Sequence, residues 1–597
     1  MKGFRAGDLC PSFPSPAGDR SLSQPTVDVR AVARILEEIA GLLELKGENP
    51  FKVRAYENAA RALDGLTEDL GGIIEAGTLT EVPGIGSSIA LRIVELWKTG
   101  RMVFHEELLQ AIPPGYVEMV RIPGLGAKRV RVLGEKLEVT TVAGLKAAAE
   151  QGLIRSLKGF GEQSEKKILA GIAILEKGAG RHLAGDVRPL AEELLGKLRE
   201  TAPVEASEVG GSLRRWLETV KDVDLLVATR KPDKVTKEFL KLLPTADLIG
   251  SGDTKTSVRL RTGLAVDLRL VTPEQFPFAL HYFTGSVAHN VRVRSRALER
   301  GMSLNEYELS GKPHGPIRSE KDLFETLDLE YIEPELREDR GEIEAAEKKA
   351  LPRLVTMEDM RGILHCHSTY SDGRSSLIEM AEAATAWGAT YLGIADHSAT
   401  ARYAGGLSEA DLERQWAEID AWNAKSKKLR ILKGSEVDIL PDGTLDYPDS
   451  ILEKLDYVVV SVHTHFTMSE ADMTKRVTRA LRNKHVSILA HPTGRLLLDR
   501  DGYAIGLEEV FRVASGEGVF VEINSNPHRL DLDWRQVIQA KARGVRFAVN
   551  PDAHHASGYA DLRYGIGAAR KAWLTKEDVV NTLPVDRALP LFGSRRS

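Results

Sequence analysis

Three aspartates near the middle of the chain have the spacing of a phosphoryl-transfer site. Asp222 and Asp224 lie two residues apart in the β-rich run DVDLLVAT, so both carboxylates are predicted to point to one face of a strand. Asp267 lies in a second alternating run, LAVDLRLV, which could pair beside the first. Three converging carboxylates can hold two Mg²⁺ ions about 4 Å apart, which clamp the attacking and leaving oxygens of a phosphoryl group.

A glycine-serine pair upstream of these aspartates could bind the phosphates of a substrate. Gly211 and Ser212 open a predicted helix, whose free backbone N–H groups could hold nucleotide phosphates together with Arg215. An isolated Asp-x-Asp is usually a solvated strand face, but one preceded by Gly-Ser and Arg-Arg is much rarer. The combination therefore favours a catalytic role over a structural one.

The last part of the chain is rich in residues that bind transition metals. Ten of the fifteen histidines follow residue 360, and a pair such as His365 and His367 would face the same side of a strand end. Imidazole and carboxylate together suit Zn²⁺, Mn²⁺ or Fe²⁺. A lone histidine is more often a structural hydrogen-bonding residue, but a cluster of this size predicts a metal centre. The candidate ligands are His365, His367, Asp372, Asp396, His397, Glu436, His463, His491, Asp552 and His554.

The elements that must position these ligands recur regularly along the chain. Seven apolar runs each stop at a residue that can bind a metal, at intervals of about 30 residues, the length of one βα unit. These seven residues are His365, Asp396, Glu436, His463, His491, Glu522 and Asp552. Repeated parallel βα units can close into a barrel, whose sites form at the C-terminal ends of the strands. The pattern therefore predicts a barrel with the ligands on one rim.

Three Gly-x-Gly-type turns in the first third of the chain precede predicted helices. They occur in VPGIGSSIALRI, IPGLGAKRVRVL and LKGFGEQSEKKI, and basic residues such as Lys128 follow them. Glycines there let backbone N–H groups approach a phosphate at a helix N-terminus, a contact to the DNA backbone without base reading. One copy would indicate only a turn between helices, whereas three favour phosphate binding and resemble helix-hairpin-helix motifs. The candidate glycines are Gly84, Gly86, Gly124, Gly126, Gly159 and Gly161.

Length and composition indicate a multidomain cytosolic protein. At about 150 residues per domain, the 597 residues predict about four domains. The chain is 42% hydrophobic and 28% charged, without an apolar run long enough for a membrane helix or the apolar segment of a secretion signal. Two cysteines exclude a disulfide framework and a cysteine-based zinc finger. A net charge of −5 argues against a globally basic nucleic-acid coat, but the total can hide a local basic surface.

Shifts in composition and periodicity predict the domain boundaries. Amphipathic helices dominate until about residue 180, short β-rich runs alternate with helices after that, and a charged stretch ending in a proline separates the histidine-rich region. The predicted parts are a flexible tail (1–27), a helical DNA-binding domain with the first turn (28–101), a fingers-like helical domain with the other two turns (102–180), an α+β domain (181–335), a linker (336–358) and the barrel (359–597).

Residues 28–335 resemble the family X DNA polymerases, in which the α+β part is a nucleotidyltransferase palm with a thumb. The resemblance implies that Asp222 and Asp224 bind both metals. It further implies that Asp267 binds the catalytic metal and helps to activate the primer 3′-hydroxyl. The substrates would be dNTPs and gapped or primer-template DNA, with Mg²⁺ as cofactor.

The segment YFTGSVAHNVRVR matches the family's nucleotide-binding and thumb segment. The likeness implies that Tyr282, Phe283 and Gly285 surround the sugar of the incoming nucleotide. It places Asn290 near the base of that nucleotide and Arg294 toward the template strand.

Two positions depart from the family pattern. Members that remove 5′-deoxyribose phosphate carry a Schiff-base lysine after the first turn, but here Arg92 occupies that position and Ser88 the neighbouring lysine position. Arginine stays protonated and is no amine nucleophile at neutral pH, so the usual lyase site is not expected, although Lys52 could replace it. Ala265 stands two residues before Asp267, where the eukaryotic repair polymerase carries an arginine, which predicts a differently tuned catalytic aspartate.

Residues from about 359 to 580 resemble the PHP (polymerase and histidinol phosphatase) domain, a distorted (β/α)₇ barrel with three metals. All nine ligand positions of the family carry metal-competent side chains, so the resemblance implies an active phosphoesterase that uses Mn²⁺ or Zn²⁺. The implied sets are His365, His367, Glu436 and Asp552 for one metal, Asp372, His397 and His554 for a second, and Glu436, His463 and His491 for a third.

These features together predict a repair polymerase that fills short gaps, with a C-terminal domain that processes 3′-ends. That domain would act as a 3′→5′ exonuclease, 3′-phosphatase or phosphodiesterase and could also cut at abasic sites. The expected protein is a cytoplasmic, nucleoid-associated monomer without membrane contact. Two alternatives stay open: a phosphoesterase for small phosphates with a relic nucleotidyltransferase, and a DNA-binding scaffold with inert sites.

Overall fold

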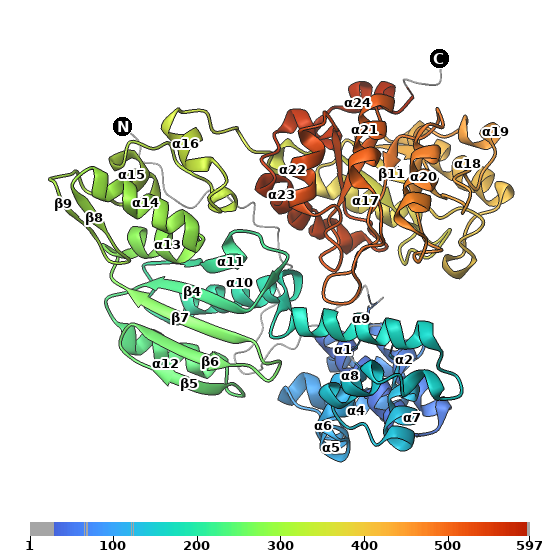
Figure 1. Cartoon of the computed structure of the whole chain (residues 1–597), viewed down its shortest axis with the longest axis horizontal. Helices are drawn as coiled ribbons and strands as arrows, with labels where there is room; N and C mark the ends of the chain where they lie inside the picture. Colours follow the sequence, from blue (N-terminus) through green and yellow to red (C-terminus); the bar gives the residue numbers. More distant parts are fainter. Residues whose placement is uncertain (1–28, 65, 67–69, 121, 123–124, 594–597) are drawn as a thin grey trace. The chain divides into compact units, whose positions relative to one another are not determined.

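The computed structural model describes residues 29–64, 66, 70–120, 122 and 125–593, and Figure 1 shows its helices and strands. These residues form two compact units. The first contains the described residues up to Val120 together with Gly126–Leu145, and the second contains nearly all of the rest, from Lys146 onward. The predicted tail at residues 1–27 lies outside the described residues.

Helices build the first unit. The predicted amphipathic helix begins at Val29, and Val32, Leu36 and Ile39 are buried at steps of three and four residues because they share one helix face. The helices are α1 (Val29–Lys46), α2 (Pro50–Asp64), α3 (Leu70–Ala76), α4 (Ser87–Thr99), α5 (Val103–Ala111), α6 (Pro114–Val120) and α7 (Ala127–Leu137). The first two Gly-x-Gly turns precede α4 and α7, as the sequence predicts.

The third turn belongs to the second unit. It lies between η2 (Ile154–Ser156) and α9 (Glu162–Gly178), after α8 (Val142–Glu150). The units therefore divide near residue 145, whereas the sequence predicted one helical domain over 102–180. Arg181, just after α9, donates hydrogen bonds to Thr219 beside the sheet that follows, which ties this hairpin to that sheet.

A five-stranded sheet of strand order β2-β4-β7-β6-β5 forms the palm. At its centre β4 (Asp222–Ala228) and β7 (Ala265–Val271) run parallel, and every other pair is antiparallel. The outer strands are β2 (Ala206–Val209), β6 (Lys255–Arg259) and β5 (Asp247–Ser251). Residues of α10 (Ala184–Thr201) and α12 (Pro232–Leu242) share a hydrophobic core with these strands, so the central strands are held rigidly.

The thumb has a core of its own. It combines α13 (Phe276–Thr284), α14 (Val287–Glu299), α15 (Glu320–Thr326), the hairpin β8 (Met302–Leu304) and β9 (Leu309–Gly311), and α16 (Glu342–Glu347). The sequence predicted a linker over 336–358, but Ile343, Ala346 and Leu354 are buried in the thumb core. The charged residues of this stretch hide an apolar face that completes that core.

Parallel strands of the C-terminal domain close into the predicted barrel. The strands are β10 (Gly362–Cys366), β11 (Tyr391–Ile394), β12 (Arg430–Lys433), β13 (Glu436–Asp438), β14 (Val459–Ser461), β15 (Ile488–Leu489), β16 (Phe520–Asn524) and β17 (Phe547–Asn550). They form one sheet of β10 to β12 and another of β13 to β17. The bridges His397↔Glu436 and Cys366↔Ala553 join these sheets at both edges. Because β12 and β13 follow each other after two residues, the barrel has seven βα units and is distorted at that break.

Helices follow the strands around this barrel. They are α17 (Leu377–Trp387), α18 (Glu409–Lys425), α20 (Glu470–Leu481), α21 (Leu507–Glu517), α22 (Trp534–Lys541) and α23 (Leu562–Lys571), with α24 (Val585–Gly593) near the end of the chain. The described residues of the C-terminal domain bury a large apolar core that includes Leu392, Val460 and Val521. The strands therefore have a fixed frame, which places their C-terminal ends on one rim.

Candidate functional site

Two of the three palm aspartates face each other across neighbouring strands. Asp224 of β4 is in register with Asp267 of β7, and Asp222 lies opposite Ala265. Because alternate residues of a strand share a face, all three carboxylates lie on one side of the sheet. The side chains of Asp224 and Asp267 are only 17% and 14% exposed, whereas Asp222 is exposed. The structure thus brings these predicted residues together on one face of the palm sheet.

Two basic residues that sequence reasoning missed contact these carboxylates. Arg269 Nε donates to Asp224 Oδ1 at 3.0 Å, and Lys255 Nζ lies 2.7 Å from Asp267 Oδ2. Burial raises the pKa of Asp224, and Arg269 partly offsets that rise. Arg269 follows Asp267 by two residues in an alternating strand, so the period of two already placed both side chains on one face. Lys255 gave no such signal because its strand pairs only in the folded sheet.

The predicted phosphate-binding loop lies directly against the carboxylates. Gly210 N donates to Asp224 O at 2.8 Å, and Gly211 has a positive φ of 63°. A Cβ at Gly211 would lie 2.6 Å from Asp224 Oδ2, so only glycine fits here without a shift. Ser212 follows within α11 (Gly211–Arg214). The loop therefore places backbone N–H groups next to the carboxylates, as phosphate transfer would require.

Thumb residues hold the two arginines of this loop. Arg215 Nε donates to Glu338 Oε1 at 2.9 Å and its Nη1 to Thr284 O at 2.8 Å. Arg214 binds the buried Glu320, which also pairs with Arg337. Although burial would raise it, these two guanidinium groups hold the pKa of Glu320 well below its usual range. Arg214 therefore has a structural role. Arg215 is held beside the loop, and of its two terminal nitrogens Nη1 makes the hydrogen bond to Thr284 O.

The thumb segment provides the predicted nucleotide-contacting residues. The rings of Tyr282 and Phe283 lie edge to face with centroids 5.1 Å apart, and the guanidinium of Arg269 stacks 3.9 Å from the Phe283 ring. Asn290 Nδ2 donates to Tyr282 O at 2.6 Å, while its buried Oδ1 has no hydrogen-bond partner. A Cβ at Gly285 would lie 2.2 Å from that Oδ1, which explains the glycine. Arg294 is exposed on α14.

The barrel rim gathers the nine metal ligands that the PHP resemblance implies. These ligands form four sets, and within each set the candidate nitrogen and oxygen atoms all lie within 4.8 Å of one another. Among the described residues, every group close enough to share one ion in this way lies in the C-terminal domain. The sets are His367, Asp372, His397 and His554; His365, Glu436 and His491; His365, His367 and Asp552; and His397, Glu436 and His463.

The observed sets divide the ligands differently from the implied ones. Glu436 bridges two sets, as implied, but it is grouped with His365 and His491 in one and with His397 and His463 in the other. His367 lies with Asp372 as well as with Asp552.

Charge pairing within the rim shifts the pKa values of its residues. Burial and the nearby His554 lower the pKa of His367 to about 3. Although burial opposes it, Glu436 and Asp438 raise the pKa of His463 to about 10, and Asp372 raises that of His554 to about 9. Three deeply buried histidine nitrogens, Nε2 of His365 and both ring nitrogens of His367, lack hydrogen-bond partners. Buried imidazoles without partners fit metal ligation, since the ion would replace the missing partner.

Buried carboxylates orient two of these histidines. Glu522 Oε1 lies 2.6 Å from Nδ1 of His365, and Asp438 Oδ1 lies 2.7 Å from Nδ1 of His463. Such contacts fix which ring nitrogen faces a metal. Sequence reasoning placed Glu522 at a strand end without a role and missed Asp438, whose position on β13 becomes significant only beside His463. The predicted Asp396 accepts hydrogen bonds from Ser368, Ser371 and Gln415 instead of joining a ligand set.

The Gly-x-Gly turns leave helix N-termini open. Gly86, Gly126 and Gly161 are the N-cap residues of α4, α7 and α9, and no side chain caps these helices. A Cβ at any of the three would meet nothing within 4 Å, so internal packing does not require glycine there. Gly84 and Gly159 have positive φ angles of 96° and 92°, and Lys128 is exposed on α7. Gly124 lies outside the described residues.

The position of the family's lyase lysine is packed against an aromatic ring. The guanidinium of Arg92 lies 3.5 Å from the centroid of Phe104, and Lys52 Nζ lies 5.5 Å from the same centroid. Lys52 also pairs with Glu48 at 3.4 Å. Ser88 is exposed at the start of α4. Lyase chemistry at Lys52 stays a prediction.

Comparison with known proteins places the chain among its relatives. Four family models match it: a helix-hairpin-helix domain at residues 28–102, a SAM-like helix-hairpin-helix tandem at 116–173, a DNA polymerase beta thumb at 279–338 and a PHP domain at 364–526. The chain is 40% identical over 555 residues to the DNA polymerase/3′-5′ exonuclease PolX of Bacillus subtilis (strain 168). That match covers 92% of this chain and 96% of the relative.

Two further relatives match about a quarter of the chain. A probable phosphatase of Thermoanaerobacter sp. (strain X514) is 32% identical over 168 residues, 26% of this chain and 66% of the relative. A probable phosphatase of Syntrophotalea carbinolica is 26% identical over 162 residues, 26% of this chain and 65% of the relative. Within the described ranges, no helix is both long and apolar enough to cross a membrane.

Proposed function

This chain belongs to the PolX family of DNA polymerase/3′-5′ exonucleases, and we propose that it fills short gaps during DNA repair. Its palm would extend a primer 3′-hydroxyl with dNTPs, and its C-terminal domain would shorten or clean 3′-ends. The observation that carries the proposal is the alignment of Asp224 with Asp267 beside the Gly211 loop, on the same chain as the nine-ligand rim.

The palm has the groups that nucleotidyl transfer needs. Asp222, Asp224 and Asp267 would hold Mg²⁺, which supplies electrostatic stabilisation of the transferring phosphoryl group. Backbone N–H groups of Gly211 and Ser212 bind the triphosphate at the start of α11. Because Asp267 faces Asp224 across the strands, its carboxylate can orient the primer 3′-hydroxyl and accept its proton.

The barrel rim has the groups of a phosphoesterase. Its histidines and carboxylates would hold up to three ions, Mn²⁺ or Zn²⁺, which lower the pKa of a bound water and stabilise the leaving oxygen. Glu522 and Asp438 hold His365 and His463 in place, so that these rings need not reorient during turnover. A 3′-terminal phosphodiester or phosphate is the proposed substrate, and cutting at abasic sites is a further candidate activity.

The helical hairpins suit tracking of a DNA backbone. Three open helix N-termini with a nearby lysine bind phosphates without reading bases. A phosphoesterase for small molecules has no use for them, which weighs against the first alternative. We propose that the protein acts as a monomer on nucleoid DNA in the cytoplasm.

A labelled primer on a one-nucleotide gap tests both activities. Wild type, Asp222→Ala plus Asp224→Ala, and His365→Ala plus His367→Ala are incubated with Mg²⁺ or Mn²⁺, with and without dNTPs. Loss of extension only in the aspartate variant, together with loss of shortening only in the histidine variant, supports two separable DNA activities. A wild type that binds the gap but neither extends nor shortens the primer would instead favour the scaffold alternative.

A further inference from the structure

The C-terminal domain packs against the palm at the phosphate-binding loop. Trp216, the residue after Arg215, contacts α23: its ring lies edge to face with that of Tyr564, with centroids 6.0 Å apart. A Cβ at Gly567 of α23 would lie 2.5 Å from the Trp216 ring, so the helix approaches as closely as glycine allows. Arg188 of the palm stacks on the same indole at 3.7 Å. The end of the loop is therefore held between the two domains.

A chain of charges crosses this contact to Arg215. The ammonium of Lys571, at the end of α23, lies 2.5 Å from Glu338 Oε1. The same oxygen accepts the hydrogen bond from Arg215 Nε at 2.9 Å. The side chain of Lys571 is fully buried, and its Nζ lies 4.7 Å from the centroid of Trp534. A buried ammonium needs a charged partner, and Glu338 provides it.

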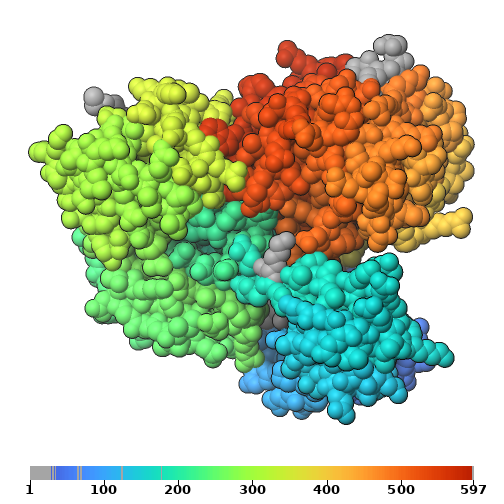
Figure 2. All heavy atoms as spheres, viewed as in Figure 1, coloured from blue at the N-terminus to red at the C-terminus, as the bar shows by residue number. Residues whose placement is uncertain are grey.

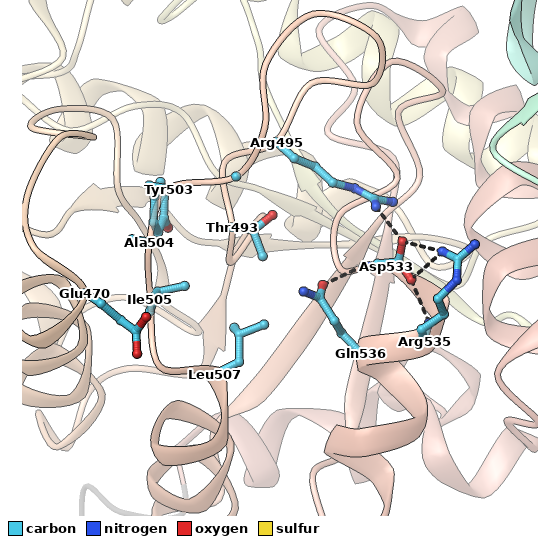
Figure 3. A pocket seen from close by; sticks show the side chains of 11 residues that line it. Glu470, Thr493, Arg495, Tyr503, Ala504, Ile505, Leu507, Asp533, Arg535 and Gln536 are labelled. Atoms are coloured by element: carbon cyan, nitrogen blue, oxygen red, sulfur yellow. Dashed lines mark hydrogen bonds and ion pairs between the residues drawn. The ribbon is translucent and has the colours of Figure 1, made fainter. Parts of the chain in front are cut away.

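Other ion pairs also join the C-terminal domain to the palm and thumb. Arg570 Nε lies 2.6 Å from Glu335 Oε1 of the thumb. Arg535 reaches Glu218 of the palm at 3.4 Å. It also binds Asp533, which Arg495 binds too (Figure 3). In the space-filling view the yellow-green thumb meets the red part of the C-terminal domain (Figure 2). The position of Lys571 is thus fixed by its surroundings.

We infer that Lys571 is a positioning residue for nucleotide incorporation, because it neutralises Glu338 and so keeps the charge of Arg215 available to the triphosphate. This inference rests on the proposed polymerase function. Arg215, Glu338 and Lys571 together carry one net positive charge. Without Lys571, the Arg215 and Glu338 pair is neutral, and the attraction for the triphosphate weakens.

The test compares Lys571→Met with a matched variant at the preceding residue, Arg570. Arg570→Met also removes a cation of α23 that binds a thumb carboxylate, but no bond links Arg570 to Arg215 in the described contacts. Incorporation into a one-nucleotide gap is measured against dNTP concentration, with exonuclease rate and gapped-DNA affinity as further readouts. Lys571→Met is expected to raise the KM for dNTP about tenfold with kcat changed less than about twofold, leaving the other two readouts unchanged. Arg570→Met is expected to keep the KM of wild type.

Two further variants separate charge from packing. Lys571→Met combined with Glu338→Gln restores one net charge and is expected to return the KM to within about threefold of wild type. Glu338→Gln alone, which leaves Lys571 in place, is expected not to raise the KM. A purely structural role would make the double variant worse than either single one and would lower extension, exonuclease rate and thermal midpoint together.

The outcomes also separate this inference from the proposed function. An unchanged dNTP KM in Lys571→Met, or an equal rise in Arg570→Met, overturns the role of Lys571 while wild-type extension keeps the polymerase assignment. Absence of extension by wild type overturns the polymerase assignment and the inference with it.

Discussion

The palm and the barrel rim are two metal-binding regions built in opposite ways. The palm places three carboxylates on two strands, leaves Asp222 exposed and pairs the other two with Arg269 and Lys255. The rim draws nine ligands from six strand ends, and the side chains of His365, His367 and Glu436 are at most 1% exposed.

This difference reflects what each region must bind. A polymerase site receives a charged nucleotide at every turnover, so an exposed carboxylate such as Asp222 suits it. A site that holds its ions throughout needs buried ligands fixed by their neighbours, as Glu522 and Asp438 fix two histidines. Lys571 of the C-terminal domain contacts Glu338, which also binds Arg215 of the palm.

Glu436→Gln tests whether the barrel rim can lose its activity while the palm keeps its own. Glu436 serves two ligand sets at once, because four histidines lie within 3.5 Å of its carboxylate: His365, His397, His463 and His491. We expect the exonuclease rate to fall at least about 10³-fold, because metal ions supply several kcal/mol of charge stabilisation. Primer extension should stay within about twofold of wild type. Equal loss of both activities in the gap assay would show that the regions are not independent.

Glu320→Gln tests a buried carboxylate that belongs to neither site. It leaves Arg214 and Arg337 with an uncharged partner, so we expect a loss of about 3 kcal/mol of stability near pH 7. The pKa of Glu320 is held well below its usual range when folded, so this stabilisation is fully present above the unfolded value of about 4.3 and is lost as the pH falls below it.

Calorimetry at a series of pH values checks this prediction. The difference in thermal midpoint between wild type and Glu320→Gln should shrink below about pH 4. Glu325→Gln, an exposed site on the same helix, is the control and should differ little at any pH. A difference that stays constant with pH would contradict the ionised state of Glu320.

Gly211→Ala tests whether the palm needs the close approach of the Gly211 loop to Asp224. The new methyl group would meet Asp224 Oδ2 at 2.6 Å and occupy a residue with positive φ, so we expect extension to fall about 100-fold. Gly196→Ala, at a helical glycine with nothing within 4 Å, should be neutral or slightly stabilising. Single-turnover incorporation measures the effect. Normal incorporation by Gly211→Ala would remove the loop from the nucleotide site.

Glu522→Gln tests whether the buried carboxylate beside His365 helps the rim to bind metal. The amide can still contact His365 but loses the charge that raises the basicity of the ring, so we expect an exonuclease rate about 30-fold lower that recovers at higher Mn²⁺ concentration. Asp438→Asn makes the same change at His463 and should behave alike. A rate that does not respond to Mn²⁺ would indicate that Glu522 serves the chemistry directly rather than the binding of metal.

Local patterns in the sequence predicted the candidate ligands and the strands that carry them. The period of two put Asp222 and Asp224 on one strand face, and the recurrence of apolar runs ending in His, Asp or Glu predicted the barrel and its rim. These signals lie within one element or one repeating unit. They therefore need no knowledge of how distant segments pack.

Which distant residues come into contact depends on how the strands and domains pack. Nothing near Arg215 in the sequence indicates Glu338 or Lys571, and the charged stretch at 336–358 hid the apolar face that fills the thumb core. The same holds for Lys255 beside Asp267 and for the way Glu436 divides its histidines. Such contacts depend on strand register and on the docking of whole domains, which are set by packing across hundreds of residues rather than by local periodicity.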